Sequence, residues 1–347
     1  MLQNLTDAEW SRALPKVLLH DHLDGGLRPA TLLDLLRAQR LEAPAPDADA
    51  LAAWFDARAH AGSLNEYLRG FALTVAAMAT LPGLERVAFE AAEDARADGC
   101  VLAEFRMAPL LLEPHGMPGE EVVEAILAGL KRSPLPCGLI VCGMRTDKPA
   151  NTLRSARLAV KYAGHGAIAF DLAGAERNFP PGDHAQSLRA ARDAGLGLTC
   201  HAGESDRGDR VLEAAALGAT RIGHGINIVR GDTPEQTREW VARAKELGLH
   251  FEVCPTSNLH TGAVTSLRTH PIREMVEAGL SVSCSTDNRL MSGVTLSSEL
   301  ENLHTRTRLS YPQLAQLQRA AVSASFLPKA TRDAAMAEVE KGWAALK

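Results

Sequence analysis

Short apolar stretches alternate with longer amphipathic stretches along most of the chain. Eight of the short stretches have the length and composition of buried strands. The segments between them carry the apolar spacing of helices, and several end at a glycine. Strands that alternate with helices predict a parallel sheet that is covered on both faces. The predicted strands are residues 16–20, 100–107, 138–144, 167–172, 196–201, 220–224, 250–255 and 281–287.

The number of strand–helix units predicts the fold class. Eight units in one chain favour an α/β fold of the (β/α)8 TIM type, in which the strands close into a barrel inside a ring of helices. An open, doubly wound sheet is the alternative, but no Gly-x-Gly-x-x-Gly motif follows the first predicted strand. Residues 27–98 predict extra helices after that strand, and we expect residues 1–347 to form a single domain.

Composition and charge narrow the class of protein. The 347 residues include 42 acidic and 37 basic ones, and this balance does not predict a nucleic-acid-binding surface. The first ten residues, MLQNLTDAEW, do not resemble a signal peptide, and no apolar run is long enough for a membrane helix. The six cysteines form no Cys-x-x-Cys pair and are typical of buried thiols. We therefore expect a cytoplasmic protein without a nucleic-acid or membrane partner.

Histidines and carboxylates gather at the predicted strand ends, where barrel enzymes build their active sites. The first strand leads into HDHLDGG, the fifth into HAGE, the sixth into GHG and the eighth into STDN. His20 and His22 are two residues apart, so their side chains point to the same side of an extended chain. Three imidazoles and a carboxylate suit a zinc ion and leave a position for water. The predicted metal ligands are His20, His22, His201 and Asp287.

Each candidate residue also has an ordinary structural explanation. His201 taken alone resembles a core histidine, and Asp287 could cap a helix. Glu204 follows His201 by three residues, where a carboxyl group can donate a proton to a substrate. For His224, which lies between glycines, a structural and a catalytic role both stay open. Asn288 is of a residue type that is common in turns.

Two further polar residues, Arg106 and Asn258, lie at predicted strand ends, and we expect them to position neighbouring loops through hydrogen bonds. The remaining histidines have no comparable setting and receive no function. They are His60, His115, His165, His184, His250, His260, His270 and His304.

The motifs HDHLDGG, DLAG, HAGE, GHG and STDN, in this order and spacing, resemble those of the adenosine and adenine deaminase family of the amidohydrolase superfamily. The resemblance covers about residues 14–330 and implies a (β/α)8 barrel with one zinc ion. It implies hydrolytic deamination of adenosine and 2′-deoxyadenosine to inosine and ammonia, in purine metabolism and salvage. The alternative is deamination of free adenine or of another adenosine-like metabolite, such as aminodeoxyfutalosine.

The resemblance also implies a role for each residue of the site. Glu204 would protonate the purine N1, and His224 would lie beside the attacking water. Gly174 would offer its backbone N–H to N3, and Asp24 would contact a ribose hydroxyl. An apolar cover over the pocket would come from the segment with Trp54, Phe55, Leu64 and Leu68. The zinc ligands would be the four residues named above.

Two positions bear on the choice of substrate. Asp24 stands where relatives that act on free adenine more often have Glu, which favours a nucleoside. Asn288 stands where the commonest family pattern has a second aspartate that contacts N7. An Asn amide always carries donors, so we expect Asn288 to donate to N7. The sequence does not explain the segment RLMSG that follows, and it leaves the oligomeric state and the metal bound in the cell open.

Overall fold

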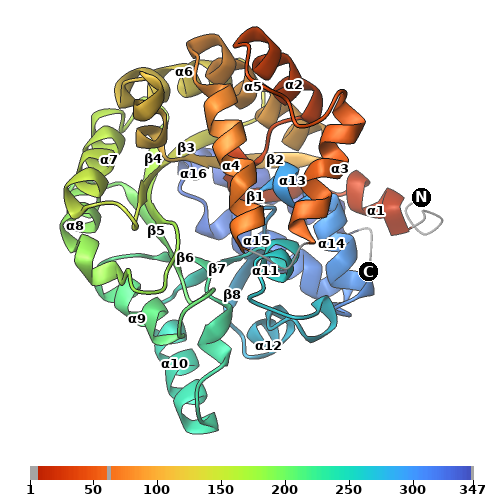
Figure 1. Ribbon diagram of the computed structural model, residues 1–347. Helices are drawn as coiled ribbons and strands as arrows, with labels where there is room; N and C mark the ends of the chain where they lie inside the picture. Colours follow the sequence, from red (N-terminus) through yellow and green to blue (C-terminus); the bar gives the residue numbers. More distant parts are fainter. Residues whose placement is uncertain (1–6, 61–63, 345–347) are drawn as a thin grey trace.

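Eight parallel strands form the centre of the computed structural model, which describes residues 7–60 and 64–344 (Figure 1). The strands pair in chain order, and each lies parallel to its neighbours. They are largely buried, as a sheet covered on both faces requires; in the second strand only Val101 is partly exposed. The strands are β1 (Lys16–His22), β2 (Cys100–Met107), β3 (Cys137–Met144), β4 (Ala167–Ala173), β5 (Gly197–Ala202), β6 (Arg221–His224), β7 (His250–Val253) and β8 (Ser281–Cys284).

The sheet closes on itself between β8 and β1. The backbone N–H of His22 donates to the carbonyl of Asp287 at 2.7 Å, and the N–H of Asp287 donates to the carbonyl of His20 at 2.9 Å. These bonds confirm the (β/α)8 barrel in place of an open sheet. They also join the residues of two predicted metal-binding motifs through backbone bonds.

The last strand ends earlier than the sequence predicts. β8 stops at Cys284, and Asp287 forms a separate bridge to Asp21 of β1. Asp287 has a left-handed backbone with φ of 59°, which a regular strand does not accommodate. The chain therefore leaves the sheet while its carboxylate still lies next to β1.

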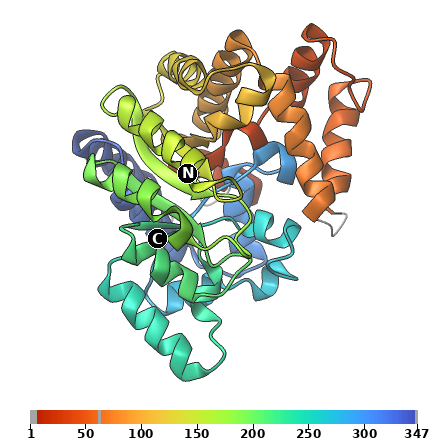
Figure 2. The same cartoon turned by 60° about the vertical axis from the view of Figure 1, so that its left-hand side comes forward.

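Helices surround the strands, and each gap between consecutive strands holds at least one (Figures 1 and 2). Four α-helices, α2 to α5, separate β1 from β2, so the predicted extra helices are confirmed. The α-helices are α1 (Asp7–Ala13), α2 (Pro29–Ala38), α3 (Ala48–Ala59), α4 (Leu64–Met78), α5 (Leu81–Ala97), α6 (Gly119–Lys131), α7 (Pro149–Lys161), α8 (Ala185–Asp193), α9 (Asp209–Ala216), α10 (Pro234–Glu246), α11 (Pro255–His260), α12 (Ile272–Glu277), α13 (Arg289–Ser292), α14 (Leu296–Thr305), α15 (Tyr311–Ala324) and α16 (Lys329–Trp343). The 3-10 helices are η2 (Leu23–Gly25), η3 (Pro109–His115), η4 (Pro181–His184), η5 (Ile226–Val229) and η6 (Leu267–Thr269).

Helix length and composition also bear on membrane insertion. Within residues 7–60 and 64–344, no single helix is long and apolar enough to cross a membrane. One pair, Gly70–Met78 with Leu81–Ala97, passes that test when taken together, but it bends by 115° at the break.

A network of ion pairs between charged side chains spans the interior of the barrel. Arg106 of β2 donates to Asp171 of β4 at 2.8 Å and to Glu252 of β7 at 2.5 Å. Arg221 of β6 donates to the other oxygen of Glu252 and to Glu104 of β2, both at 2.5 Å. All five side chains are buried. Burial opposes the ionisation of Glu252, but the two guanidinium groups outweigh it and hold the pKa of this carboxyl well below its usual value.

Arg106 therefore differs from what the sequence predicts. It does bond to a backbone carbonyl, that of Leu19 at 2.9 Å, and to neighbouring side chains. However, it lies within the barrel and joins two carboxylates across it, rather than positioning a loop. Its two carboxylate partners come from strands that are not adjacent to β2 in the sheet, so no local sequence pattern reveals them.

Replacement of Arg106 by Met leaves Asp171 and Glu252 buried without their shared cation. We expect the free energy of unfolding to fall by about 3–5 kcal/mol, because unpaired buried charges are strongly destabilising. Arg154→Met is the control, since Arg154 pairs with Glu113 on the surface at 2.5 Å and should cost less than about 1 kcal/mol. Urea denaturation of both variants measures this, and equal losses would contradict the prediction.

Candidate active site

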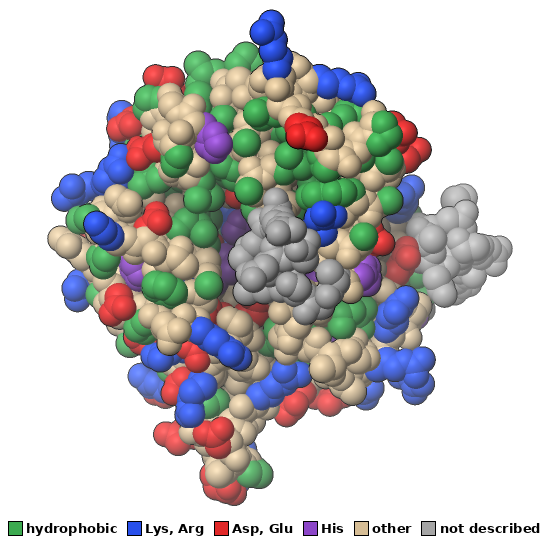
Figure 3. Space-filling model, viewed as in Figure 1, with side chains coloured by type: hydrophobic (Ala, Val, Ile, Leu, Met, Phe, Trp, Pro, Cys, Tyr) green, Lys and Arg blue, Asp and Glu red, His purple; other side chains and the backbone are tan. Residues whose placement is uncertain are grey.

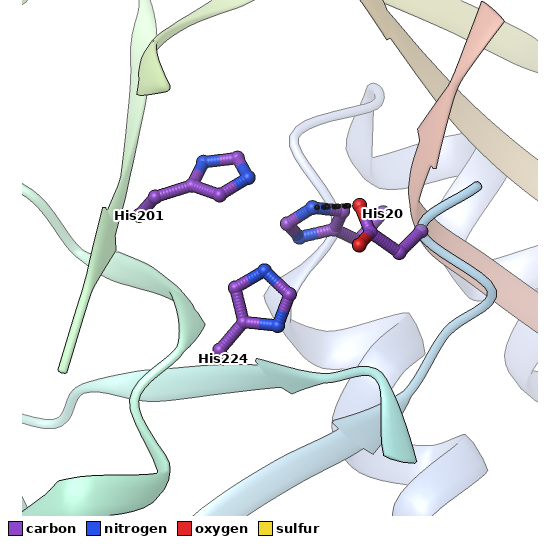
Figure 4. Close-up of side chains that lie close together, drawn as sticks. His20, His201 and His224 are labelled. Atoms are coloured by element: carbon purple, nitrogen blue, oxygen red, sulfur yellow. Dashed lines mark ion pairs between the residues drawn. The ribbon is translucent and has the colours of Figure 1, made fainter. Parts of the chain in front are cut away.

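Four buried side chains converge where the strands end (Figure 4). His20 comes from β1, His201 from β5 and His224 from the end of β6, while Asp287 follows β8. One nitrogen or oxygen atom of each lies within 4.8 Å of those of the other three. The space-filling view shows histidine side chains in a hollow near the middle of this face (Figure 3). This arrangement could hold a metal ion.

Carboxylates behind two of the histidines select the ring nitrogen that faces the centre. His20 Nδ1 lies 2.9 Å from Glu252, and His201 Nδ1 lies 3.1 Å from Asp171. An ionised carboxylate only accepts, so each Nδ1 carries a proton and each Nε2 offers a lone pair. Within the described residues, the buried Nε2 of His20 has no hydrogen-bond partner. A buried imidazole nitrogen with a free lone pair fits the requirement for a metal ligand.

Protons compete with a cation for this centre. Burial lowers the pKa of His201 to about 4 and that of His22 well below its usual value, which keeps both rings neutral at pH 7. Burial also acts against a charge on His20, but the nearby carboxylates of Asp287 and Glu252 outweigh it and raise the pKa of His20. A proton between His20 and Asp287, whose facing atoms are 3.3 Å apart, must therefore leave when a cation binds.

His22 lies at the edge of the group. Its Nε2 is 3.4 Å from Asp287 Oδ1 and 3.4 Å from His201 Nε2. Two ligand atoms on a tetrahedral zinc ion with bonds of about 2.0–2.1 Å are themselves about 3.4 Å apart, so these spacings suit zinc. The geometry thus allows two ligand sets, which share His20, His201 and Asp287 and differ in whether His22 or His224 completes them.

The charge of the network behind the histidines also favours a cation. The two arginines inside the barrel face three carboxylates, and Asp287 adds a fourth next to the histidines. With neutral imidazoles, these groups carry two more negative than positive charges. A divalent cation would balance them in a region where unpaired charge is costly.

Two residues of the site hold a left-handed backbone that is rare for residues with a side chain. His224 has φ of 60° and Asp287 has φ of 59°. Such conformations cost about 1–3 kcal/mol each and cluster at functional sites. Asp287 is held by its backbone bonds to β1 and by the hydroxyl of Ser257, which donates to its Oδ2 at 2.5 Å. The fold therefore fixes the direction of both side chains.

Glu204 lies beside His224 on one side of the cluster, with 3.7 Å between Oε2 and the ring Nε2. The other oxygen of Glu204 accepts from Asn258 at 2.8 Å and from Thr261 at 3.0 Å. Asn258 is also 3.1 Å from His224 Nδ1, so its amide joins the two side chains. This confirms the expectation that Asn258 positions its neighbours. His270, to which the sequence assigns no function, contacts Asn258 Oδ1 from behind at 3.3 Å.

Comparison with known proteins identifies the family. The family model described as Adenosine deaminase matches residues 15–342. A protein named adenosine deaminase from Mycobacterium tuberculosis (strain ATCC 25618 / H37Rv) is 39% identical over 346 residues, which span 95% of this chain and 94% of the relative. Another of that name, from Mycobacteroides abscessus, is 40% identical over 349 residues and 96% of each chain. The chain belongs to the adenosine deaminase family.

Solved structures agree with the family assignment. An adenine deaminase from Arthrobacter aurescens matches with a TM-score of 0.86 and 26% identity, over 96% of this chain and 100% of that one. An amidohydrolase from Burkholderia ambifaria with bound Zn matches with a TM-score of 0.85 and 26% identity, over 99% of this chain and 94% of that one.

Three residues that the family resemblance assigns to substrate lie at the same end of the barrel. Asp24 is buried, which raises the pKa of its carboxyl to about 7, and its Oδ1 has no hydrogen-bond partner among the described residues. Gly174 follows β4 with φ of 97°, a conformation that favours glycine. Asn288 is buried at the start of α13, and its side chain lies so close to Gly25 that a Cβ there would be 2.0 Å from Asn288 Oδ1.

The segment RLMSG, whose role the sequence does not explain, links β1 to the residues that follow β8. Arg289 Nε donates to Asp21 at 2.7 Å, and Thr286 donates to the same carboxylate at 2.7 Å. Asp21 lies between the two histidines of β1 and points away from them. The ion pair therefore fixes β1 relative to the residues that follow β8.

The expected apolar cover is only partly described. Phe55 lies on α3, buried, and packs close to Met291 and Gly70, while Trp54 contacts Phe55 with ring centroids 4.9 Å apart. The side chains of Leu64 and Leu68 lie outside the described part of the chain, so their place in the cover stays a prediction.

Two residues that orient the histidines are not among those predicted from the sequence. Asp171 lies within the apolar stretch AIAFDL and Glu252 within HFEVCP. A charged residue inside a strand that is otherwise apolar was the available signal, because such a residue must find a partner when buried. The identity of that partner is visible only in the folded barrel.

Proposed function

We propose that the chain uses one zinc ion to hydrolyse the C6 amine of adenosine and 2′-deoxyadenosine, giving inosine and ammonia. The observation that carries this proposal is the convergence of imidazoles, a carboxylate and the Glu204 carboxyl group at one end of the barrel. The named relatives at 39–40% identity support a nucleoside as substrate. Such a reaction belongs to purine salvage, and a cytoplasmic location stays a prediction.

His20, His22, His201 and Asp287 would hold the ion. The 3.3–3.4 Å spacings that link these side chains support this set. His224 is less suited to be a ligand, because Asn258 contacts its Nδ1 and its Nε2 faces Glu204. When bound, zinc supplies the Lewis acidity that makes water a nucleophile at neutral pH.

The remaining residues would move protons. Glu204 donates a proton to N1 of the purine, which draws electrons from C6 and makes that carbon open to attack. His224 accepts a proton from the attacking water, with the Asp287 carboxylate beside it. That proton passes to the C6 amine, the C6–N bond breaks and ammonia leaves. The second proton of the water returns to Glu204, and the water oxygen stays on C6 as the carbonyl of inosine.

Three further contacts would orient the substrate. Asp24 accepts from or donates to a ribose hydroxyl. The Oδ1 of this buried carboxyl supports the contact, because it has no hydrogen-bond partner among the described residues. The backbone N–H of Gly174 donates to N3, and the side-chain amide of Asn288 donates to N7. Each contact would be made from a different strand end, so the purine is fixed in the plane of its ring.

Turnover of a substrate panel tests the proposed function. Zinc-replete protein should deaminate adenosine and 2′-deoxyadenosine with kcat/KM at least about tenfold above that for free adenine, since Asp24 can engage a ribose. Aminodeoxyfutalosine is measured in the same panel, and it should react more slowly than adenosine. Free adenine is the second candidate, because the adenine deaminase from Arthrobacter aurescens has a similar fold. Adenine as much the best substrate would contradict the proposal.

Metal analysis of two histidine variants separates the two ligand sets. His22→Ala should lose stoichiometric zinc, because it removes a ligand. His224→Ala should keep about one zinc per chain yet lose turnover by at least about 100-fold, because it removes a proton acceptor. The reverse pattern, with zinc lost only in His224→Ala, would show that His224 is the ligand.

A substrate without N7 tests the role of Asn288. We expect 7-deazaadenosine, which has C–H in place of N7, to react with kcat/KM lower by about tenfold, as a lost buried hydrogen bond of about 1.4 kcal/mol implies. Asn288→Ala should lower the value for adenosine and make the two substrates equal. Equal rates for both substrates in the unaltered protein would exclude the contact between Asn288 and N7.

A further inference from the structure

The loop after β5, which carries Glu204, is bound by a carboxylate from the loop after β4. Glu176 Oε2 accepts from the N–H of Gly203 at 2.8 Å. Its Oε1 accepts from the N–H of Glu204 at 2.8 Å and from that of Ser205 at 3.2 Å. Glu176 is only 2% exposed. One buried carboxylate thus holds three consecutive amides of this loop.

The carbonyl groups of the same loop are held by Asn227, which lies in η5 after β6. Its side-chain Nδ2 donates to the carbonyl of Glu204 at 2.9 Å and to that of Asp206 at 2.8 Å. Its backbone N–H donates to the carbonyl of Gly203 at 2.9 Å. Both types of backbone group in the loop therefore bond to residues of other loops.

These contacts replace the bonds that a regular element would supply. β5 ends at Ala202 and α9 begins at Asp209, so the loop between them has no strand or helix ladder. Gly203 turns the chain with φ of 69°. Buried backbone groups need partners, and bonds from N–H groups to an ionised carboxylate are stronger than those between neutral groups. Glu176 and Asn227 therefore define where the backbone of Glu204 lies.

We propose that Glu176 and Asn227 are positioning residues, which set the backbone of Glu204 so that its carboxyl group reaches N1 of the purine. This inference rests on the proposed function. Asn258 and Thr261 hold the Glu204 side chain, so backbone and side chain are fixed by separate groups. Proton transfer needs heavy atoms within about 2.6–3.2 Å, and a shift of about 1 Å can lower the rate about 100-fold.

The conservative change Glu176→Gln tests the proposal, because it replaces one acceptor oxygen by an NH2 group that faces backbone N–H groups. We expect kcat to fall about 100-fold while KM stays within about threefold and the zinc content is unchanged. Asp98→Asn is the matched control, since Asp98 accepts from the N–H of Ser297 at 2.9 Å at the other end of the barrel. It should leave kcat within about twofold of the unaltered protein.

A double-mutant cycle with Glu204→Gln separates positioning from a general effect on folding. Without the proton donor, Glu176→Gln should reduce the residual rate by less than about threefold, because nothing is left to position. An equal factor in both backgrounds, or a kcat for Glu176→Gln within about threefold of the unaltered protein, would overturn the proposal. Asn227→Leu removes the bonds to the carbonyl groups of the loop and should follow the same pattern. This variant replaces Glu176→Gln in the cycle if Glu176→Gln does not fold.

The cycle is also independent of substrate identity. It is measured with whichever purine the unaltered protein turns over best. Failure of that protein to act on adenosine would contradict the proposed function alone. Equal factors in the cycle would contradict the positioning role alone.

Discussion

Arg106 is the cation on which the arrangement of the barrel interior depends. It lies between Asp171 and Glu252. Each of these carboxylates also contacts one histidine of the candidate metal centre. Arg221 holds the far side of Glu252. The ring orientation of His20 and of His201 is thus set by ion pairs deep in the barrel. A change at any member of this network would alter the direction of a nitrogen lone pair at the surface of the pocket.

The network has an energetic consequence for metal binding. Burying several charges is costly unless each has partners, and a pocket with excess negative charge is stabilised by a cation. A metal that binds only the folded chain adds its binding free energy to the free energy of unfolding. Stability and metal affinity should therefore be coupled in this protein, with the carboxylates as the common element.

The sequence predicts the parts of the fold and site that local patterns encode. Alternating strands and helices give the barrel, and the position of His20, His201, Glu204 and Asp287 at strand ends gives the cluster. Local sequence patterns do not reveal partners that meet only across the barrel. The sequence around Asp171 and Glu252 does not indicate which histidine each carboxylate contacts.

Other features depend on the path of the chain between elements. The early end of β8 follows from the left-handed backbone at Asp287, which no residue type at that position predicts. The three amides bound by Glu176 come into reach only because the loops after β4 and β5 are neighbours in the closed barrel. Similarly, Arg289 finds Asp21 because β8 closes against β1.

The most direct test of the proposed metal centre is anomalous diffraction at the zinc absorption edge from crystals of zinc-replete protein. One peak per chain is expected, at coordination distance of about 2.0–2.2 Å from nitrogen atoms of His20, His22 and His201 and an oxygen atom of Asp287. Glu252 and Asp171 should still contact His20 and His201 behind the ion. A peak coordinated by His224 and not by His22, or no peak in catalytically active crystals, would contradict the proposed metal centre.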